Sequence, residues 1–159
     1  MRALPQRLAK FNLILSPEKT RLLRFSRFEP KDGEAFDFLG FTYRWGVSRK
    51  GRPLVRMATS KKKLKGALQR MKGWLRTNCR RLPLRRLING LRPRLQGHWN
   101  YYGVCGNYSR MQEYYGQVIR LLHKWLNRRS QRRSYSWSGL KQMLAHYPLP
   151  RPRIIAYWD

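Results

Sequence analysis

The sequence predicts an α+β protein in which a small β-containing unit, residues 1–59, precedes a basic bundle of three to four helices, residues 60–159. Three observations lead to this fold class. Residues 36–57 are rich in β-prone side chains, the apolar period changes from near two to near 3.6 after Ser60, and most acidic residues lie before residue 38. The change of period sets the order of the elements, and the segregated charge indicates two structural units.

The first unit contains one helical pattern and two pairs of β-prone runs. Apolar spacing over residues 4–11 predicts a short helix. The runs 13–15 and 22–25 flank a polar, proline-containing segment and are typical of a strand pair, although a turn leading into a helix also fits. After a polar connector, residues 36–45 predict a strand that turns at 48–51 and returns antiparallel through 54–57.

The second unit shows helical periodicity throughout. Leu64, Leu68, Met71 and Leu75 share one face of a helix whose N-cap is predicted to be Ser60. A second helix is predicted to begin near Pro83, because proline is tolerated in the first turn of a helix, and to run to about residue 103.

Three further features complete the predicted bundle. Pro93 is expected to break or restart the second helix. A third helix is predicted from Ser109, whose spacing to Gln112 suits a capping box, with an apolar face of Met111, Tyr115, Val118, Leu122, Trp125 and Leu126. A last helix is predicted over 137–146, and the proline-rich tail 148–153 is expected to lie over the bundle.

The charge of the chain indicates a polyanionic partner. Lys and Arg number 36 against 7 Asp and Glu, which gives a net charge of +29. From residue 38 to residue 158 the sole acidic side chain is Glu113, against 28 basic ones. A solvated protein surface normally mixes both signs, so this segment is predicted to bind phosphate-rich nucleic acid.

The basic residues of the helical segment are the candidate RNA-binding residues. They form a run with no acidic residue between 61 and 86 and a second cluster between 128 and 133. The candidates are Lys61, Lys62, Lys63, Lys65, Arg70, Lys72, Arg76, Arg80, Arg81, Arg85, Arg86, Arg128, Arg129, Arg132 and Arg133. Lys and Arg side chains release counterions when they neutralise phosphates, and this release drives much of nucleic-acid affinity.

Aromatic side chains are interleaved with these cations. Aromatic rings can stack on unpaired bases, although core packing is the commoner role at helical spacing. The aromatic candidates are Trp74, Trp99, Tyr101, Tyr102, Tyr108, Tyr114 and Trp137. About two of three are expected to be structural.

No catalytic or metal-binding constellation is predicted. The three histidines lie far apart in the sequence, no two aspartates are adjacent, and the acids at 18–37 fall mostly on a loop-like connector. Cys79 and Cys105 form no metal-binding pair and are predicted to be free thiols. No apolar run approaches the length of a membrane-spanning helix, and no membrane partner is expected.

Five segments, in order, carry a resemblance to a known family. They are Leu13-Ile-Leu-Ser-Pro-Glu-Lys-Thr20, Phe36-Asp-Phe-Leu-Gly-Phe41, Thr59-Ser-Lys-Lys-Lys63, Leu95-Gln-Gly-His-Trp-Asn-Tyr-Tyr-Gly103 and His146-Tyr-Pro-Leu-Pro-Arg-Pro-Arg-Ile154. Together they resemble the C-terminal part of group II intron reverse transcriptases/maturases. Residues 1–59 are similar to the end of the palm, with Phe38, Leu39, Gly40 and Phe41 in a primer-grip-like position, and residues 60–159 to the thumb, or maturase-specific domain.

The resemblance implies an RNA-binding protein that assists intron splicing and mobility. Its implied partners are structured group II intron RNA and template–primer duplex, in the bacterial cytoplasm with the nucleoid or a ribonucleoprotein. The family's catalytic aspartates lie upstream of the matched segments, so Asp37 is not expected to be one of them. We therefore expect no enzyme activity and no cofactor in this chain, with Mg²⁺ required only in a complete polymerase.

Alternatives to this function remain open. The chain is expected to be a C-terminal piece, either one half of a split reverse transcriptase that needs a separately encoded fingers and palm, or a remnant without function. A general nucleic-acid coating protein would also be basic. Without a larger palm sheet, the β-prone runs of residues 13–57 are expected to leave open strand edges.

Overall fold

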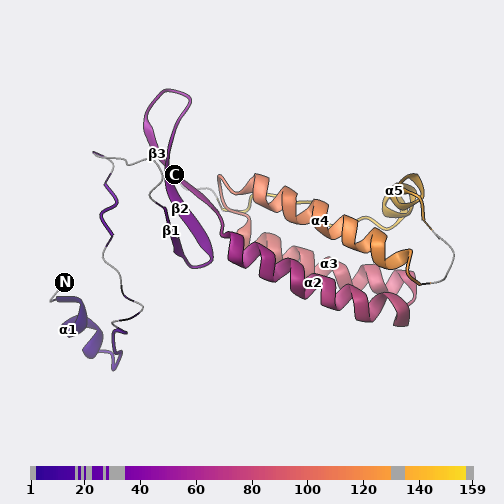
Figure 1. Cartoon of the computed structure of the whole chain (residues 1–159), viewed down its shortest axis with the longest axis horizontal. Helices are drawn as coiled ribbons and strands as arrows, with labels where there is room; N and C mark the ends of the chain where they lie inside the picture. The colour runs from indigo at the N-terminus through magenta and orange to yellow at the C-terminus, as the bar shows by residue number, and fades with distance from the viewer. Residues whose placement is uncertain are drawn as a thin grey trace. The chain divides into compact units, whose positions relative to one another are not determined.

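The computed structural model describes residues 3–16, 18, 20, 23–26, 28, 35–129 and 135–156. These residues belong to two compact units, Met1–Pro30 and Lys31–Asp159. The first unit contains the predicted short helix, α1 (Ala3–Ala9), in which no residue is buried. The second unit holds a sheet and a helical bundle (Figure 1). The domain boundary predicted at residue 60 stays a prediction, because compact units need not coincide with domains.

The strand pair predicted at 13–25 is wrong for the residues that can be described there. None of 13–16, 18, 20 and 23–25 is in a strand. The Thr20 hydroxyl instead donates to the Ser16 carbonyl at 2.6 Å, and such local bonds compete with extended structure. Ile14 is 97% exposed, so no apolar face is buried that would favour strand pairing over this local bend.

The sheet is antiparallel, with the order β1 (Ala35–Phe38), β2 (Phe41–Val47) and β3 (Pro53–Thr59). The hairpin predicted between 36–45 and 54–57 is confirmed as β2 and β3. However, 36–45 is not one strand, because the chain reverses at Leu39 and Gly40, which have φ angles of 48° and 85°. Positive φ at both central residues is the requirement of a type I′ hairpin turn, which Leu adopts less readily than Gly.

The helices are α2 (Lys61–Arg81), α3 (Leu84–Tyr102), α4 (Tyr108–Leu126) and α5 (Trp137–His146). Figure 1 shows α2, α3 and α4 side by side, with α5 at the end of the bundle away from the sheet. The predicted N-cap of α2 is confirmed, because the Ser60 hydroxyl accepts a hydrogen bond from the Lys63 amide. The apolar core is built from one face of each helix and includes the side chains Met71, Leu75, Leu87, Leu91, Leu95, Trp99, Val118, Leu122 and Leu140.

Pro93 does not break α3, contrary to the prediction. A proline inside a helix costs about 3 kcal/mol through a lost hydrogen bond and a clash with the preceding turn. Leu91 and Leu95, on either side of it, are both fully buried, and burying such side chains contributes about 1.5–3 kcal/mol each. Packing therefore holds the helix through the proline.

The capping box predicted at Ser109 and Gln112 is also wrong. α4 begins one residue earlier, at Tyr108, so Ser109 lies within the first turn. On the α4 face Tyr114 is buried, whereas the predicted Tyr115 is half-buried. The other predicted members of this face are buried as expected.

Asn107, at the start of α4, joins the sheet to the bundle. Its side chain is fully buried, and its carbonyl oxygen accepts from the Thr59 amide at 2.7 Å. Its Nδ2 donates to the Thr59 hydroxyl and to the Tyr102 carbonyl, both at 2.8 Å. One amide group thus ties the end of β3 to the end of α3 and the beginning of α4.

The C-terminal tail lies against α3, as predicted. Arg92 Nε donates to the Pro148 carbonyl and Trp99 Nε1 to the Pro150 carbonyl, each at 3.0 Å. Leu149 is buried between these two contacts. Among the described residues, no helix combines the length and the apolar character needed to cross a membrane.

Candidate nucleic-acid interface

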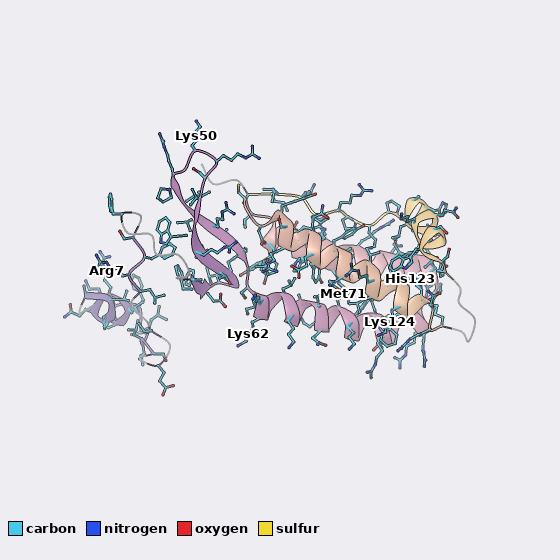
Figure 2. All side chains as sticks on the ribbon, turned by 45° about the horizontal axis from the view of Figure 1, so that its top comes forward. Arg7, Lys50, Lys62, Met71, His123 and Lys124 are labelled. Carbon is cyan, nitrogen blue, oxygen red and sulfur yellow. The ribbon has the colours of Figure 1, made fainter. Side chains whose placement is uncertain are left out.

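The basic residues of α2 lie on the sides that do not face the core. The buried positions are Leu64, Ala67, Met71, Leu75 and Cys79, at helical spacing. Figure 2 shows Met71 between the helices and Lys62 pointing away from the bundle. All the candidates of α2 are exposed, and so are Arg85 and Arg86 at the start of α3.

The second predicted cluster is divided by the structure. Arg128 is exposed, and its guanidinium carbon lies 5.4 Å from the centroid of the Trp125 ring. Arg129 is half-buried and donates to the carbonyls of Cys79 and Leu82 at the end of α2. These bonds satisfy carbonyls that a helix end leaves free, so Arg129 has a structural role. Arg132 and Arg133 lie outside the described residues.

The Arg129 contact also shows which basic residues lie together. The hydrogen bonds of Arg129 join the end of α4 to the end of α2, so the neighbouring Arg128 lies at the same end of the bundle as Arg80 and Arg81. Arg85, in the first turn of α3, follows directly from this end of α2. The exposed candidates among the described residues therefore extend from the start of α2 to this end of the bundle.

At the other end, a hollow of about 700 Å³ lies between the sheet and the starts of α2 and α4. We call it the sheet–bundle cradle. Lys61 and Lys62 line it, as do three cations that sequence reasoning missed, Arg44, Arg56 and Arg110. Its carboxylate, Asp37, accepts a hydrogen bond from the Thr42 hydroxyl at 2.5 Å.

Arg44 and Arg56 are direct cross-strand partners in the sheet. Like charges in this position destabilise a sheet. The Arg56 side chain is positioned by a bond to the Val47 carbonyl at 2.9 Å. The sequence signal was the hairpin predicted over 36–57, which places one of these arginines on each strand.

The primer-grip-like residues form the β1–β2 turn. Phe38 and Leu39 are exposed at its tip, whereas Phe41 is buried. The Leu39 carbonyl accepts from the Tyr101 hydroxyl at 2.8 Å, and the Gly40 carbonyl accepts from the Ser60 amide at 3.0 Å. The turn is thus held against α3 and the start of α2, and its role stays a prediction.

The aromatic candidates divide between core and surface. Trp99 and Tyr114 are buried, and Trp74 and Tyr102 are half-buried. Tyr101, Tyr108 and Trp137 are exposed, and Trp137 stacks on His123 with ring centroids 4.1 Å apart. Exposed or half-buried rings are those that remain accessible to a base.

The side chains that could hold a metal are dispersed. Within the described ranges, no three His, Cys, Asp or Glu side chains gather at one place. Cys79 is buried and Cys105 exposed, and both are free. Burial raises the pKa of the Cys79 thiol to about 11, against a smaller opposing effect of Arg129.

Comparison with known protein families identifies the bundle. Residues 64–143 match the family model of the group II intron, maturase-specific domain. The chain belongs to the group II intron maturase family, as a C-terminal part. The matched segment covers α3, α4 and most of α2 and α5. No curated protein and no solved structure matches the chain.

This membership confirms the resemblance seen in the sequence and relates the chain to group II intron maturases and their role in splicing. The maturase-specific domain is a non-catalytic region of the reverse transcriptase/maturase. The basic surface of α2 begins at Lys61, three residues before the matched segment, and the sheet–bundle cradle lies where the sheet precedes that segment.

Proposed function

We propose that the chain binds group II intron RNA through α2 and the sheet–bundle cradle and thereby assists splicing of the intron. The observation that carries the proposal is the exposed cationic surface of α2, which contains no acidic side chain. The cross-strand pair of Arg44 and Arg56 extends this surface onto the sheet. Such an arrangement repels itself and is stabilised by a polyanion.

The surface suits contact with the phosphate backbone more than the reading of base sequence. Lys and Arg side chains bind phosphates and fix the orientation of a nucleic acid, whereas base contacts provide sequence specificity. Because binding releases counterions, we expect the affinity for RNA to fall roughly a thousandfold or more between about 50 and 200 mM salt. Preference for the intron then comes from the shape of its fold.

The experiment that tests this proposal reverses the charge of Lys61, Lys62 and Lys65 to Glu in one variant. All three are exposed at the start of α2, and Lys61 and Lys62 line the cradle. We expect this variant to bind structured RNA at least tenfold more weakly, whatever its sequence, with a shallower salt dependence.

A matched control changes the net charge equally at another place. Arg49, Lys50 and Arg52 are exposed at the β2–β3 turn, where Figure 2 shows Lys50 at the tip. Reversing these three residues to Glu alters only the long-range attraction, which salt screens. An equal loss of affinity in both variants would show that α2 is not the binding surface.

Competition separates the maturase-type function from general coating of nucleic acid. An excess of unrelated RNA should leave binding to a group II intron largely intact, because a maturase recognises its folded shape. If unrelated RNA of the same length competes as well as the intron itself, the chain is a general RNA-binding protein.

The sheet supports a second, related proposal. In the described part of the chain, β1 and β3 each pair with a strand on one side only, and open edges accept further strands. A separately encoded fingers and palm would cover these edges, supply the Mg²⁺-binding aspartates and deliver template–primer duplex to the turn at Leu39. Primer extension by the mixture, and by neither half alone, would support this assembly. No extension by the mixture would contradict it.

A further inference from the structure

A pocket of about 360 Å³ lies between α2 and α3 and shares Arg70 with the cationic surface of α2. Its size falls within the range of small-molecule sites in proteins, about 300–1,000 Å³. We call it the α2–α3 pocket. The side chains that matter for its chemistry are Arg70, Trp74, Arg94, His98, Tyr101 and Tyr102.

One wall of the pocket is a fixed stack of Trp74 and Arg94. The guanidinium carbon of Arg94 lies 4.2 Å from the centroid of the Trp74 ring, and Arg94 Nη1 donates to the Gly90 carbonyl at 2.7 Å. The Trp74 ring lies so close to α3 that a Cβ at residue 90 would be 2.9 Å from it. Arg94 is exposed, so this wall presents a planar, positioned cation.

A second feature of the pocket is a polar atom without a partner. The His98 ring stacks on Tyr114 with centroids 3.8 Å apart, and its Nε2 atom is buried and has no hydrogen-bond partner among the described residues. Buried polar atoms are nearly always hydrogen-bonded, and leaving one unpaired is costly. Burial and, to a smaller extent, Arg70 lower the pKa of His98 to about 4, so the imidazole is neutral at pH 7.

Another part of the pocket lining is aromatic and contacts the β1–β2 turn. The Tyr101 hydroxyl donates to the Leu39 carbonyl, and its ring is edge-on to Tyr102, 4.7 Å between centroids. Arg70 lines the same pocket and is exposed. The pocket therefore combines the planar guanidinium of Arg94, aromatic side chains, a neutral imidazole and the exposed guanidinium of Arg70.

We propose that the α2–α3 pocket receives one unpaired nucleobase of the RNA bound by this chain. The inference rests on the proposed function, since it takes RNA as the ligand. A base is planar and stacks on a guanidinium group or an aromatic ring, which Arg94 and the tyrosines provide. The His98 ring lines the same pocket, and the phosphate of that nucleotide is an anion that Arg70 attracts. The cationic surface then holds the backbone, and the pocket selects a site where a base is free.

The test compares two RNA hairpins with the full chain. One has a single unpaired adenosine in its stem, and the other has an abasic nucleotide at that position, so that the phosphates are the same. We expect the hairpin with the base to bind about fivefold to a hundredfold more tightly, the range that stacking of one base on an aromatic side chain provides. The other three unpaired bases are then compared in the same stem.

A glycine at the pocket provides a variant that fills it. A Cβ at Gly97 would meet no atom within 4 Å, and the same holds for Gly116 on α4, which does not line the pocket. Gly97→Leu should reduce the ratio between the two hairpins to about one and leave the affinity for the abasic hairpin unchanged. Gly116→Leu, which makes the same change in another helix, should keep the ratio of the unchanged chain.

The outcomes separate this inference from the function on which it rests. If both hairpins bind with salt-dependent affinity but equally well, or if Gly97→Leu keeps the full ratio, the pocket proposal is overturned and RNA binding stands. If neither hairpin nor intron RNA binds at low salt, the proposed function fails and the pocket proposal with it. Arg94→Ala is a second variant, and a ratio unaffected by it would also contradict the proposal.

Discussion

Arg129 and Arg128 are neighbours in sequence but are expected to respond oppositely to substitution. Arg129 donates to the carbonyls of Cys79 and Leu82, and Arg129→Ala removes both bonds and the positive charge near the C-terminus of α2. A hydrogen bond to a charged group contributes about 1.5–3 kcal/mol when buried, and a cation at a helix C-terminus about 0.3–1 kcal/mol. Since Arg129 is half-buried, we expect a total loss of about 2–3 kcal/mol.

Thermal unfolding followed by circular dichroism measures this effect. For a unit of this size, such a loss lowers Tm by roughly 5–10 °C. Arg128 is exposed, so Arg128→Ala should change Tm by little more than about 1 °C, because surface substitutions usually alter stability by less than about 0.5 kcal/mol. In RNA binding the order should reverse, with Arg128→Ala the weaker binder. An unchanged Tm for Arg129→Ala would refute the assignment of this arginine to the end of α2.

Two further stability predictions concern buried polar groups. Burial and, less strongly, Arg70 lower the pKa of His98 to about 4 in the folded chain, whereas the unfolded chain takes up this proton near pH 6.5. The free energy of unfolding should therefore fall as the pH drops from about 6.5 to 4, by about 2 kcal/mol after allowance for partial exposure. A pH series of melting curves that is as steep for His98→Gln as for the unchanged chain would contradict this. Asn107→Ala leaves the Thr59 amide and the Tyr102 carbonyl without their partner. It should lower the free energy of unfolding, measured with denaturant, by about 3 kcal/mol. A loss below about 1 kcal/mol would argue that Asn107 does not hold the sheet to the bundle.

The helices could be predicted because each buries its own periodic face. Leu64, Met71 and Leu75 predicted the buried side of α2, and the predicted bounds of α5 agree with the structure. Apolar spacing of this kind is a local property, so it is visible without knowledge of the neighbours. The exposure of the basic residues could be predicted in the same way, since they occupy the helix positions that apolar residues do not.

The errors arose where distant segments decide the conformation. Pro93 stays within α3 because residues of other helices bury its flanks, and Asn107 is not a conventional cap because β3 and α3 use its side chain. Arg129 was predicted to bind RNA because its contact with α2, 50 positions away in the sequence, is not visible in the local pattern. No local pattern contains such information. The turn at Leu39 was missed for a different reason, since leucine rarely adopts the positive φ that this turn requires.

The distribution of charge links these observations to function. The core of the bundle is built from apolar and aromatic side chains, and the salt bridge described in α4, between Arg110 and Glu113 at 2.7 Å, joins two residues of one helix. The cations of α2 and the Arg44–Arg56 pair carry like charges that repel one another in the isolated fold. Residues that oppose folding and yet lie together on one surface are best explained by a ligand that neutralises them. A bound polyanion would stabilise the folded chain by linkage, because it binds the assembled surface more tightly than the unfolded chain. Folding and RNA binding are therefore expected to depend on the same arrangement of helices.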